Sequence, residues 1–333
     1  MIFNYEEICE DFLKDLPKRI RTIIVRRFGL KGNQRETLQT IGEDFGITRE
    51  RVRQIQNFAI SRLRSKIKRH QPVFQFFAYQ LRTTGNLRKE DTFLRILGPE
   101  LFANEIYFLL SVGEGFDRFF ETREFYTCWT IDRNSLTVAK KTTEKVSKVL
   151  QKNKKPLETS DLESLFNRIQ LPALLAYLEA SKFIQRGPQG LWGLRDWPEI
   201  NPKGVRDKAY IIFKREKRPL HFKEVAQLIN ESGIFPSSKK AHYQTVHNEL
   251  IKDDRFVLVG RGLYALAEWG YKPGVVKDII VDVLRNAKKP LTKEEIVEEV
   301  LKQRVVAKNT ILLNLHDKRY FKKNSEGKYE LLE

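Results

Sequence analysis

The sequence contains only two cysteines among its 333 residues, Cys9 and Cys128, and they lie far apart along the chain. So few cysteines exclude a disulfide scaffold, and the lack of a Cys-x-x-Cys pair excludes the common zinc and thiol-redox motifs. No stretch approaches the roughly 18 uncharged apolar residues that a membrane-spanning helix needs. The N-terminal residues lack the basic segment and apolar core of a secretory signal. We therefore expect a reduced, soluble, cytoplasmic protein.

Motifs that carry catalysis or bind metals are also missing from the sequence. His242 and His247 are five residues apart, so they do not share one helix face, and no cysteine lies near them. Gly113 and Gly115 lack the remaining residues of a phosphate-binding loop. The acidic residues within 294–299 lie beside lysines, as on a solvated helix face. We expect neither an enzyme nor a bound metal, cofactor or small-molecule substrate.

Positive charge is unevenly distributed along the chain. Lysine and arginine number 61 against 43 aspartates and glutamates, which gives a net charge of +18. Residues 47–70 hold eight basic residues and one acid, Glu50, and account for the whole +7 excess of residues 1–70. Apolar residues make up 41% of the chain, enough to form packed cores. This pattern indicates a polyanionic partner, most often nucleic acid, bound at 47–70.

Two amphipathic helices joined at Gly46 are predicted around this basic segment. Thr37 and Thr48 are suited to cap their N-termini. In the second helix the buried stripe is Val52, Ile55, Ala59 and Leu63. The opposite face begins with Glu50, Arg53 and Gln54, and such side chains can hydrogen-bond to base edges. The pattern predicts a helix-turn-helix with its second helix in the major groove, although a solvated helix of a bundle has the same spacing.

Three stretches give a more specific signal than the spacing does. They are Arg26-Arg27-Phe28-Gly29-Leu30, Thr37-Leu38-x-x-Ile41-Gly42-x-x-Phe45-Gly46 and Thr48-Arg49-Glu50-Arg51-Val52-Arg53-Gln54-Ile55. Over about residues 16–67 the chain closely resembles region 4 of sigma-70 family transcription factors. In that family this region reads the −35 promoter element and touches RNA polymerase.

The resemblance implies roles for individual residues. The residues expected to contact bases are Arg49, Glu50, Arg53 and Gln54. The residues expected to contact DNA phosphates are Arg19, Arg27, Thr37, Thr48 and Arg51. The residues expected to dock the flap of the bacterial RNA polymerase β subunit are Ile20, Ile23 and Ile24.

The sequence also departs from the sigma-70 pattern. Basic positions that meet activators in the family are Phe58 and Ser61 here, so we expect no such contacts and expect Phe58 to pack on a neighbouring domain. Only about 16 residues precede the match, so we expect the region that melts the −10 element to be lacking. Aromatic residues crowd 74–129, and we expect them to form cores rather than to stack on unpaired bases.

The rest of the chain repeats one pattern. A helix leads to a basic residue, Pro and Leu, more helix follows, and the unit ends in Gly, a spacer, an aromatic residue and Leu. The opening leucines are Leu157, Leu220 and Leu291, with Leu87 in a degenerate fourth unit. Helices followed by a two-stranded hairpin form a winged helix. We therefore predict a mainly α fold, a helix-turn-helix domain followed by a string of winged-helix units with small β-hairpins. The predicted domains are 1–70, 71–136, 137–200, 201–270 and 271–333.

The unit at about 218–269 resembles the HARE-type helix-turn-helix, a winged-helix module. Pro219-Leu220, Val246-His247-Asn248-Glu249-Leu250 and Gly262-Leu263-Tyr264-Ala265-Leu266 carry this likeness. The module occurs in the delta subunit of some bacterial RNA polymerases and in DNA-associated proteins. The candidate secondary DNA contacts, in its helix 237–251, are Lys239, Lys240, Tyr243 and Gln244. The corresponding helix 172–181 has no basic residue and is expected to contact protein or fill a core.

These observations predict a sequence-specific, DNA-binding regulator of transcription initiation, associated with the nucleoid. Its expected partners are double-stranded promoter DNA and bacterial RNA polymerase, and no membrane. The alternative is a delta-like polymerase accessory protein with little DNA specificity. A third class, a DNA-processing or defence component, would use the winged helices to read DNA.

Overall fold

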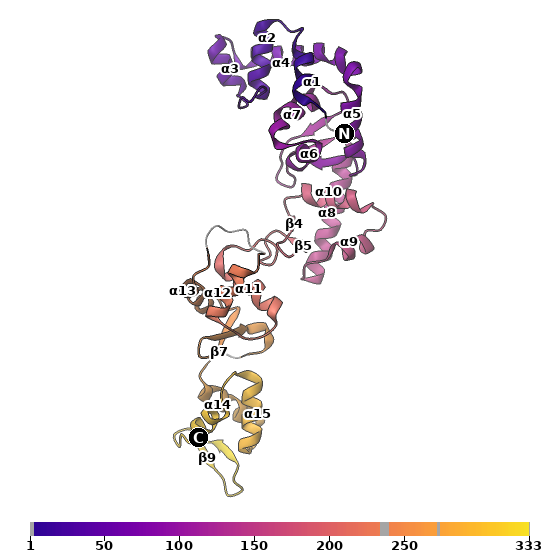
Figure 1. Cartoon of the computed structure of the whole chain (residues 1–333). Coiled ribbons are helices and arrows are strands. Elements are labelled where there is room, and N and C mark those ends of the chain that lie inside the picture. The colour runs from indigo at the N-terminus through magenta and orange to yellow at the C-terminus, as the bar shows by residue number, and fades with distance from the viewer. Residues whose placement is uncertain (1–2, 234–239, 272–273, 333) are drawn as a thin grey trace. The chain divides into compact units, whose positions relative to one another are not determined.

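The computed structural model describes residues 3–233, 240–271 and 274–332 (Figure 1). Helices dominate, and the strands form small antiparallel sheets of two or three strands, which confirms the predicted fold class. The chain divides into two compact units, residues 1–186 with 190–195 and residues 187–189 with 196–333. Within the described ranges, no helix is both long enough and apolar enough to cross a membrane.

The first unit begins with a helical domain. Its elements are α1 (Tyr5–Leu13), α2 (Lys18–Phe28), α3 (Leu38–Phe45), α4 (Arg49–Leu63), a 3₁₀ helix (Arg64–His70) and α5 (Gln71–Arg82). Phe12 of α1 is fully buried and packs edge-on against Phe74 and Phe108, at centroid distances of 6.2 and 6.4 Å. The predicted boundary at residue 70 therefore falls inside one shared core.

Two winged-helix units complete the first compact unit. The first consists of α5, β1 (Leu87–Lys89), α6 (Glu90–Leu97), α7 (Ala103–Val112), β2 (Asp117–Phe119) and β3 (Cys128–Thr130). The second consists of α8 (Asn134–Asn153), α9 (Thr159–Leu165), α10 (Leu171–Ala180), β4 (Ile184–Arg186) and β5 (Trp192–Leu194). The predicted boundary at 136 lies inside α8, and one buried cluster joins Leu87 and Cys128 to Ala173 and Tyr177. The division into five domains stays a prediction.

The second compact unit repeats the same order of elements twice. One copy consists of α11 (Gly204–Glu216), β6 (Leu220–His221), α12 (Phe222–Glu231), α13 (Tyr243–Lys252), β7 (Phe256–Gly260) and β8 (Leu263–Leu266). The other consists of α14 (Val276–Ala287), α15 (Lys293–Gln303), α16 (Lys308–Leu315), β9 (Phe321–Lys323) and β10 (Tyr329–Leu331). Each copy has its own apolar core, built from helices and hairpin.

The opening leucine of each repeat has one structural task. All four leucines are buried and pair in antiparallel register with the returning strand of their own hairpin. The pairs are Leu87 with Thr130, Leu157 with Trp192, Leu220 with Tyr264 and Leu291 with Tyr329. The leucine thus ties the first helix of a unit to its wing, which explains why the sequence repeats it.

Most aromatic residues of 74–129 are in cores, as expected. Phe74, Phe77 and Trp129 are buried, whereas Phe120 at the wing of the first winged-helix unit is 73% exposed. Helix α10, which has no basic residue, is buried along most of its length. It therefore fills a core, one of the two roles expected for it.

Candidate nucleic-acid interface

Helices α3 and α4 form the predicted helix-turn-helix. Helix α3 ends at Gly46 in the left-handed conformation, with φ of 61°, and Thr48 Oγ1 caps α4 by accepting from the Arg51 amide at 3.1 Å. A Cβ atom on Gly42 would lie 2.6 Å from the Ile47 carbonyl oxygen, so only glycine lets the turn approach α3 this closely. Buried Val52 anchors α4 in a small core with α2 and α3.

The N-terminal half of α4 presents the predicted base-reading residues to solvent. Arg49, Glu50, Arg53 and Gln54 are all exposed. The Arg53 guanidinium donates to both Glu50 oxygens, at 2.8 and 2.6 Å, and Arg51 Nη1 donates to Gln54 Oε1 at 3.1 Å. The hydrogen bond from Arg53 lowers the pKa of Glu50, so this carboxylate remains an acceptor. The four side chains therefore form an ordered row of donors and acceptors.

The predicted phosphate-contacting residues divide into two groups. Thr37, Thr48 and Arg51 lie exposed at the starts of α3 and α4, and Thr37 Oγ1 accepts from the Thr40 amide at 3.1 Å. Exposed Arg19 donates to the Phe45 carbonyl oxygen at 3.4 Å.

Arg27 is held inside the domain. Its Nε donates to Gln56 Oε1 at 3.0 Å, and its Nη1 donates to the Glu36 carbonyl oxygen at 2.9 Å. Because the side chain is half-buried, Arg27 connects α2 to α4 and to the loop before α3. Its structural role was not foreseen from the sequence.

The isoleucines expected to dock polymerase are not equally accessible. Ile23 and Ile24 are fully buried, Ile23 against α3 and α4 and Ile24 in the main core of the first unit. Direct contact of either side chain with a partner is therefore incompatible with this structure. Ile20 is half-buried and is the one of the three that keeps accessible surface.

The basic segment 47–70 is not uniformly free to bind an anion. Lys66 Nζ donates to the Asp11 carbonyl oxygen at 2.6 Å and forms an ion pair with Asp15 at 2.6 Å. Arg69 Nη1 lies 3.2 Å from both Asp11 carboxylate oxygens. The end of the segment therefore anchors the domain to α1. The basic residues of the segment without an ion pair, within the described residues, are Arg49, Arg51, Arg62, Arg64 and Lys68.

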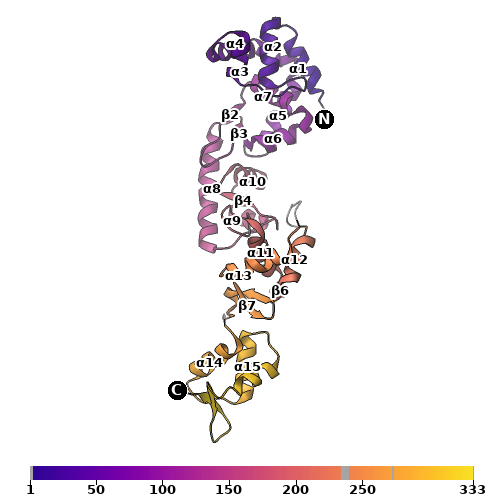
Figure 2. The same cartoon turned by 90° about the vertical axis from the view of Figure 1, so that its left-hand side faces the viewer.

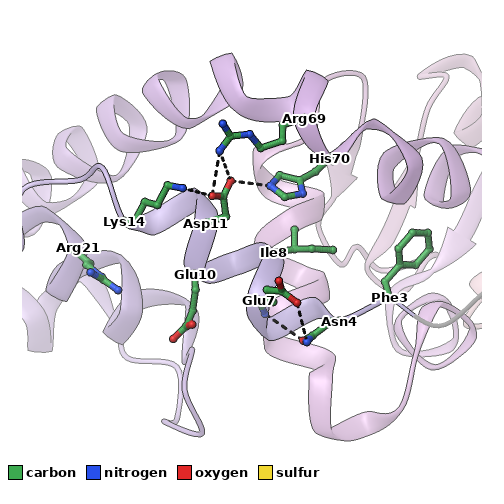
Figure 3. Close-up of a pocket in the computed structure, with 10 residues that line it drawn as sticks. All are labelled: Phe3, Asn4, Glu7, Ile8, Glu10, Asp11, Lys14, Arg21, Arg69 and His70. Carbon is green, nitrogen blue, oxygen red and sulfur yellow. Dashed lines mark hydrogen bonds and ion pairs between the residues drawn. The ribbon is translucent and has the colours of Figure 1, made fainter.

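A pocket of about 740 Å³ lies beside this anchor (Figure 3). Figure 3 shows Lys14, Arg69 and His70 converging on Asp11, with ion-pair distances of 2.5, 3.2 and 2.9 Å. These partners hold the pKa of Asp11 well below its ordinary value. Because the central acid is shared among basic groups of the same protein, the cluster is a junction between α1 and the 3₁₀ helix.

Two further features of the domain were missed from the sequence. Arg26 Nε donates to Glu36 Oε1 at 2.7 Å, and the same guanidinium pairs with Asp44, so α2 is tied to both ends of α3. The hydrogen bond from Arg26 lowers the pKa of Glu36. Phe58 of α4 is 56% exposed, so the expectation that it packs on a neighbouring domain is wrong within the described residues.

The candidate secondary DNA contacts lie at the start of α13. Lys240, Tyr243 and Gln244 are exposed, and Lys239 lies outside the described residues. The His242 ring caps α13 by accepting from the Gln244 amide at 3.3 Å. Tyr243 lies 6.3 Å from the Phe222 ring, so its aromatic ring is supported by α12. The arrangement presents one cation, a phenol and an amide at a helix N-terminus, suited to phosphate contacts.

Two family models match parts of the chain. Residues 12–65 match sigma-70, region 4. Residues 205–269 match the HARE-HTH family, a helix-turn-helix domain of ASXL and restriction endonuclease proteins. Both resemblances found in the sequence are thereby confirmed, and together they support a DNA-binding role connected with transcription.

Curated relatives match the same N-terminal region. The chain is 47% identical over 61 residues to the RNA polymerase sigma factor RpoS of Coxiella burnetii (strain RSA 493 / Nine Mile phase I). It is 42% identical over 59 residues to the RNA polymerase sigma factor SigA of a Bacillus species. Each match covers 18% of this chain and 17% or 16% of the relative. The chain thus spans about one sixth of the length of these relatives.

Proposed function

We propose that this protein is a sequence-specific DNA-binding regulator of transcription initiation. The N-terminal half of α4 reads a −35-type promoter element from the major groove. Arg49, Glu50, Arg53 and Gln54 specify bases, and phosphate contacts from Arg19, Arg51 and the helix starts at Thr37 and Thr48 set the register. Arg27 contributes by fixing α2 and α4 to each other.

One observation carries this proposal. The segment that matches sigma-70 region 4 folds as a helix-turn-helix, and its second helix exposes an ordered row of residues suited to base edges. A solvated helix of a bundle does not require an arginine-carboxylate pair and an arginine-amide pair side by side at its N-terminal end.

Selection of duplexes from a random-sequence pool tests the proposal. The full chain is expected to enrich a motif related to the −35 element, and Arg49→Ala is expected to lose that motif. Arg82→Ala is a matched control, because Arg82 is exposed on α5 of the same compact unit. Failure of the wild-type chain to enrich any motif would remove sequence-specific reading from the account.

We also propose that the domain contacts bacterial RNA polymerase through the exposed side of α2, next to half-buried Ile20. The proposal is supported by the sigma-factor relatives of this segment. Ile20→Ala is expected to weaken capture of purified polymerase at least several-fold while leaving DNA binding unchanged. Capture that is equal for Ile20→Ala and the wild-type chain would contradict it.

The alternative is a polymerase accessory protein that binds polymerase and little DNA. The match of residues 205–269 to a helix-turn-helix module, which resembles one in polymerase delta subunits, favours this alternative. It becomes the leading account if polymerase is captured while no duplex motif is enriched.

A further inference from the structure

Helix α8 carries a row of lysines along one face. Lys141, Lys145, Lys148 and Lys152 recur at spacings of four, three and four residues, which places them within about 60° of one another on the helix. All four are exposed. At a rise of about 1.5 Å per residue, the row is roughly 16 Å long. We call these four residues the lysine row.

The lysine row is free of neutralising partners. Within the described residues none of its members forms an ion pair, whereas neighbouring Lys140 pairs with Glu124 at 2.8 Å. Residues 137–155 hold seven lysines and one acid, Glu144, a density close to that of 47–70. Net charge averaged over the remaining chain hides this segment, because its neighbours are acidic.

The opposite face of α8 is buried. Its buried residues include Ala139, Val146 and Leu150, and they pack toward the core that contains α10. The lysine row therefore points away from the core of its own winged-helix unit. Because the apolar face is already covered, the helix cannot insert into a lipid surface as an amphipathic helix does.

The shape of the row favours a linear polyanion. Four unpaired ammonium groups in a line match charges that recur along a strand, as phosphates do along duplex DNA, better than a compact anion. The row lies in the same compact unit as the proposed reading helix α4, and Figure 2 shows α8 along the same edge of that unit as α3 and α4. A duplex held by α4 is therefore the polyanion that the row is placed to meet.

We propose that the lysine row of α8 is a second DNA-binding surface, which contacts the phosphates of duplex DNA without regard to sequence. The inference deepens the proposed function and rests on it for the identity of the ligand. The surface adds affinity and salt dependence, while α4 supplies the sequence preference.

The test measures binding of the full chain to a −35-containing duplex and to a scrambled duplex over a series of salt concentrations. K141Q/K145Q/K148Q is expected to weaken binding to both duplexes by the same factor. It should also make the slope of log affinity against log salt shallower by about 2 to 3, because each lost phosphate contact removes about 0.9. Glutamine and lysine have similar helix propensities, so α8 is expected to remain folded.

Two matched variants make the outcome decisive. K203Q/K289Q/K318Q removes the same charge from exposed lysines of the second compact unit and is expected to leave the slope nearly unchanged. K141R/K145R/K148R keeps the charge and is expected to retain wild-type binding.

An unchanged slope for the glutamine variant of the row would overturn the proposal, and so would an equal loss in the control variant. Loss of binding to single-stranded RNA alone would reassign the row to another ligand. Equal wild-type affinity for the two duplexes would instead count against base reading by α4, a result that the slope comparison does not depend on.

Discussion

At the scale of single residues, side chains of α4 order one another before any DNA is bound. Glu50 is held by Arg53, and Gln54 is held by Arg51. Fixing rotamers in advance reduces the entropy lost when the side chains meet base edges. The same pairs must open or tilt to reach a base, so each of them influences which base is accepted.

Gln54→Ala tests the reading role of a single side chain. We expect it to relax preference at one base pair, with a loss of about 1–3 kcal/mol of discrimination. Competition binding with duplexes that differ at single positions measures this loss. Gln75→Ala, at an exposed position of α5, is the control. Uniform weakening across all duplexes would indicate that Gln54 contacts phosphate rather than a base.

Asp11→Asn tests the junction at α1. Because the pKa of Asp11 is lowered by Lys14, His70 and Arg69, its stabilising effect is present at neutral pH and is lost as the pH falls below the ordinary range of a carboxyl group. At pH 7 the variant is expected to be less stable by about 1 kcal/mol. Calorimetric unfolding at pH 7 and pH 3 should show that difference shrinking in acid.

Asp254→Asn is the control for this experiment, since Asp254 is exposed and has no ion pair among the described residues. A difference between Asp11→Asn and wild type that persists undiminished at pH 3 would contradict the electrostatic account of the junction.

Which residues contact what was only partly predictable from the sequence. The exposed row on α4 follows from helical periodicity and is observed. Periodicity along one helix does not reveal packing between helices, so the burial of Ile23 and Ile24 was missed. Charge counting likewise treated Lys66 and Arg69 as free, although carboxylates 50 or more residues away pair with them.

At the scale of elements, three helices end at a lysine in a left-handed conformation. Lys154, Lys217 and Lys288 have φ of 51°, 53° and 51°, and each lies three residues before the opening leucine of its repeat. The turn brings that leucine beside its hairpin. A residue with a Cβ atom is disfavoured in this conformation, which glycine adopts freely.

Lys154→Gly is therefore expected to stabilise the end of α8 by about 0.5–1 kcal/mol. Lys148→Gly, in the middle of the same helix, is expected to cost about 1 kcal/mol. Hydrogen exchange of the α8 amides in the full chain measures both effects locally. Equal destabilisation by the two variants would show that the Lys154 side chain makes a contact that outweighs the backbone strain.

The hairpins were predictable because each carries its own local pattern, a glycine followed by an aromatic residue and a leucine. Helix lengths were harder. Helix α8 was expected over 144–151 but spans Asn134–Asn153, since its first turns contain polar and small residues that bury against neighbouring elements. A boundary expected at 136 was consequently placed inside a helix.

At the scale of the whole molecule, two compact units each carry a candidate DNA surface. The first holds α4 and the lysine row, and the second holds the start of α13. Surfaces connected by one chain raise each other's effective concentration on a long duplex, so moderate contacts can add up to tight binding.

A triple variant tests the contribution of the second unit. Lys240→Ala, Tyr243→Ala and Gln244→Ala together are expected to weaken binding to a long duplex several-fold while keeping the preference for its −35 element. Lys203→Ala, at an exposed position before α11, serves as the control. Unchanged affinity of the triple variant would assign this winged-helix unit to protein contacts.

The central claim is that α4 reads promoter sequence, and binding of the full chain to a −35-containing duplex and a scrambled duplex, each at two salt concentrations, tests it most directly. We predict tighter binding to the −35 duplex, weakening of both complexes with salt, and loss of the preference in Arg49→Ala. Equal affinity for both duplexes at both salt concentrations would contradict the claim.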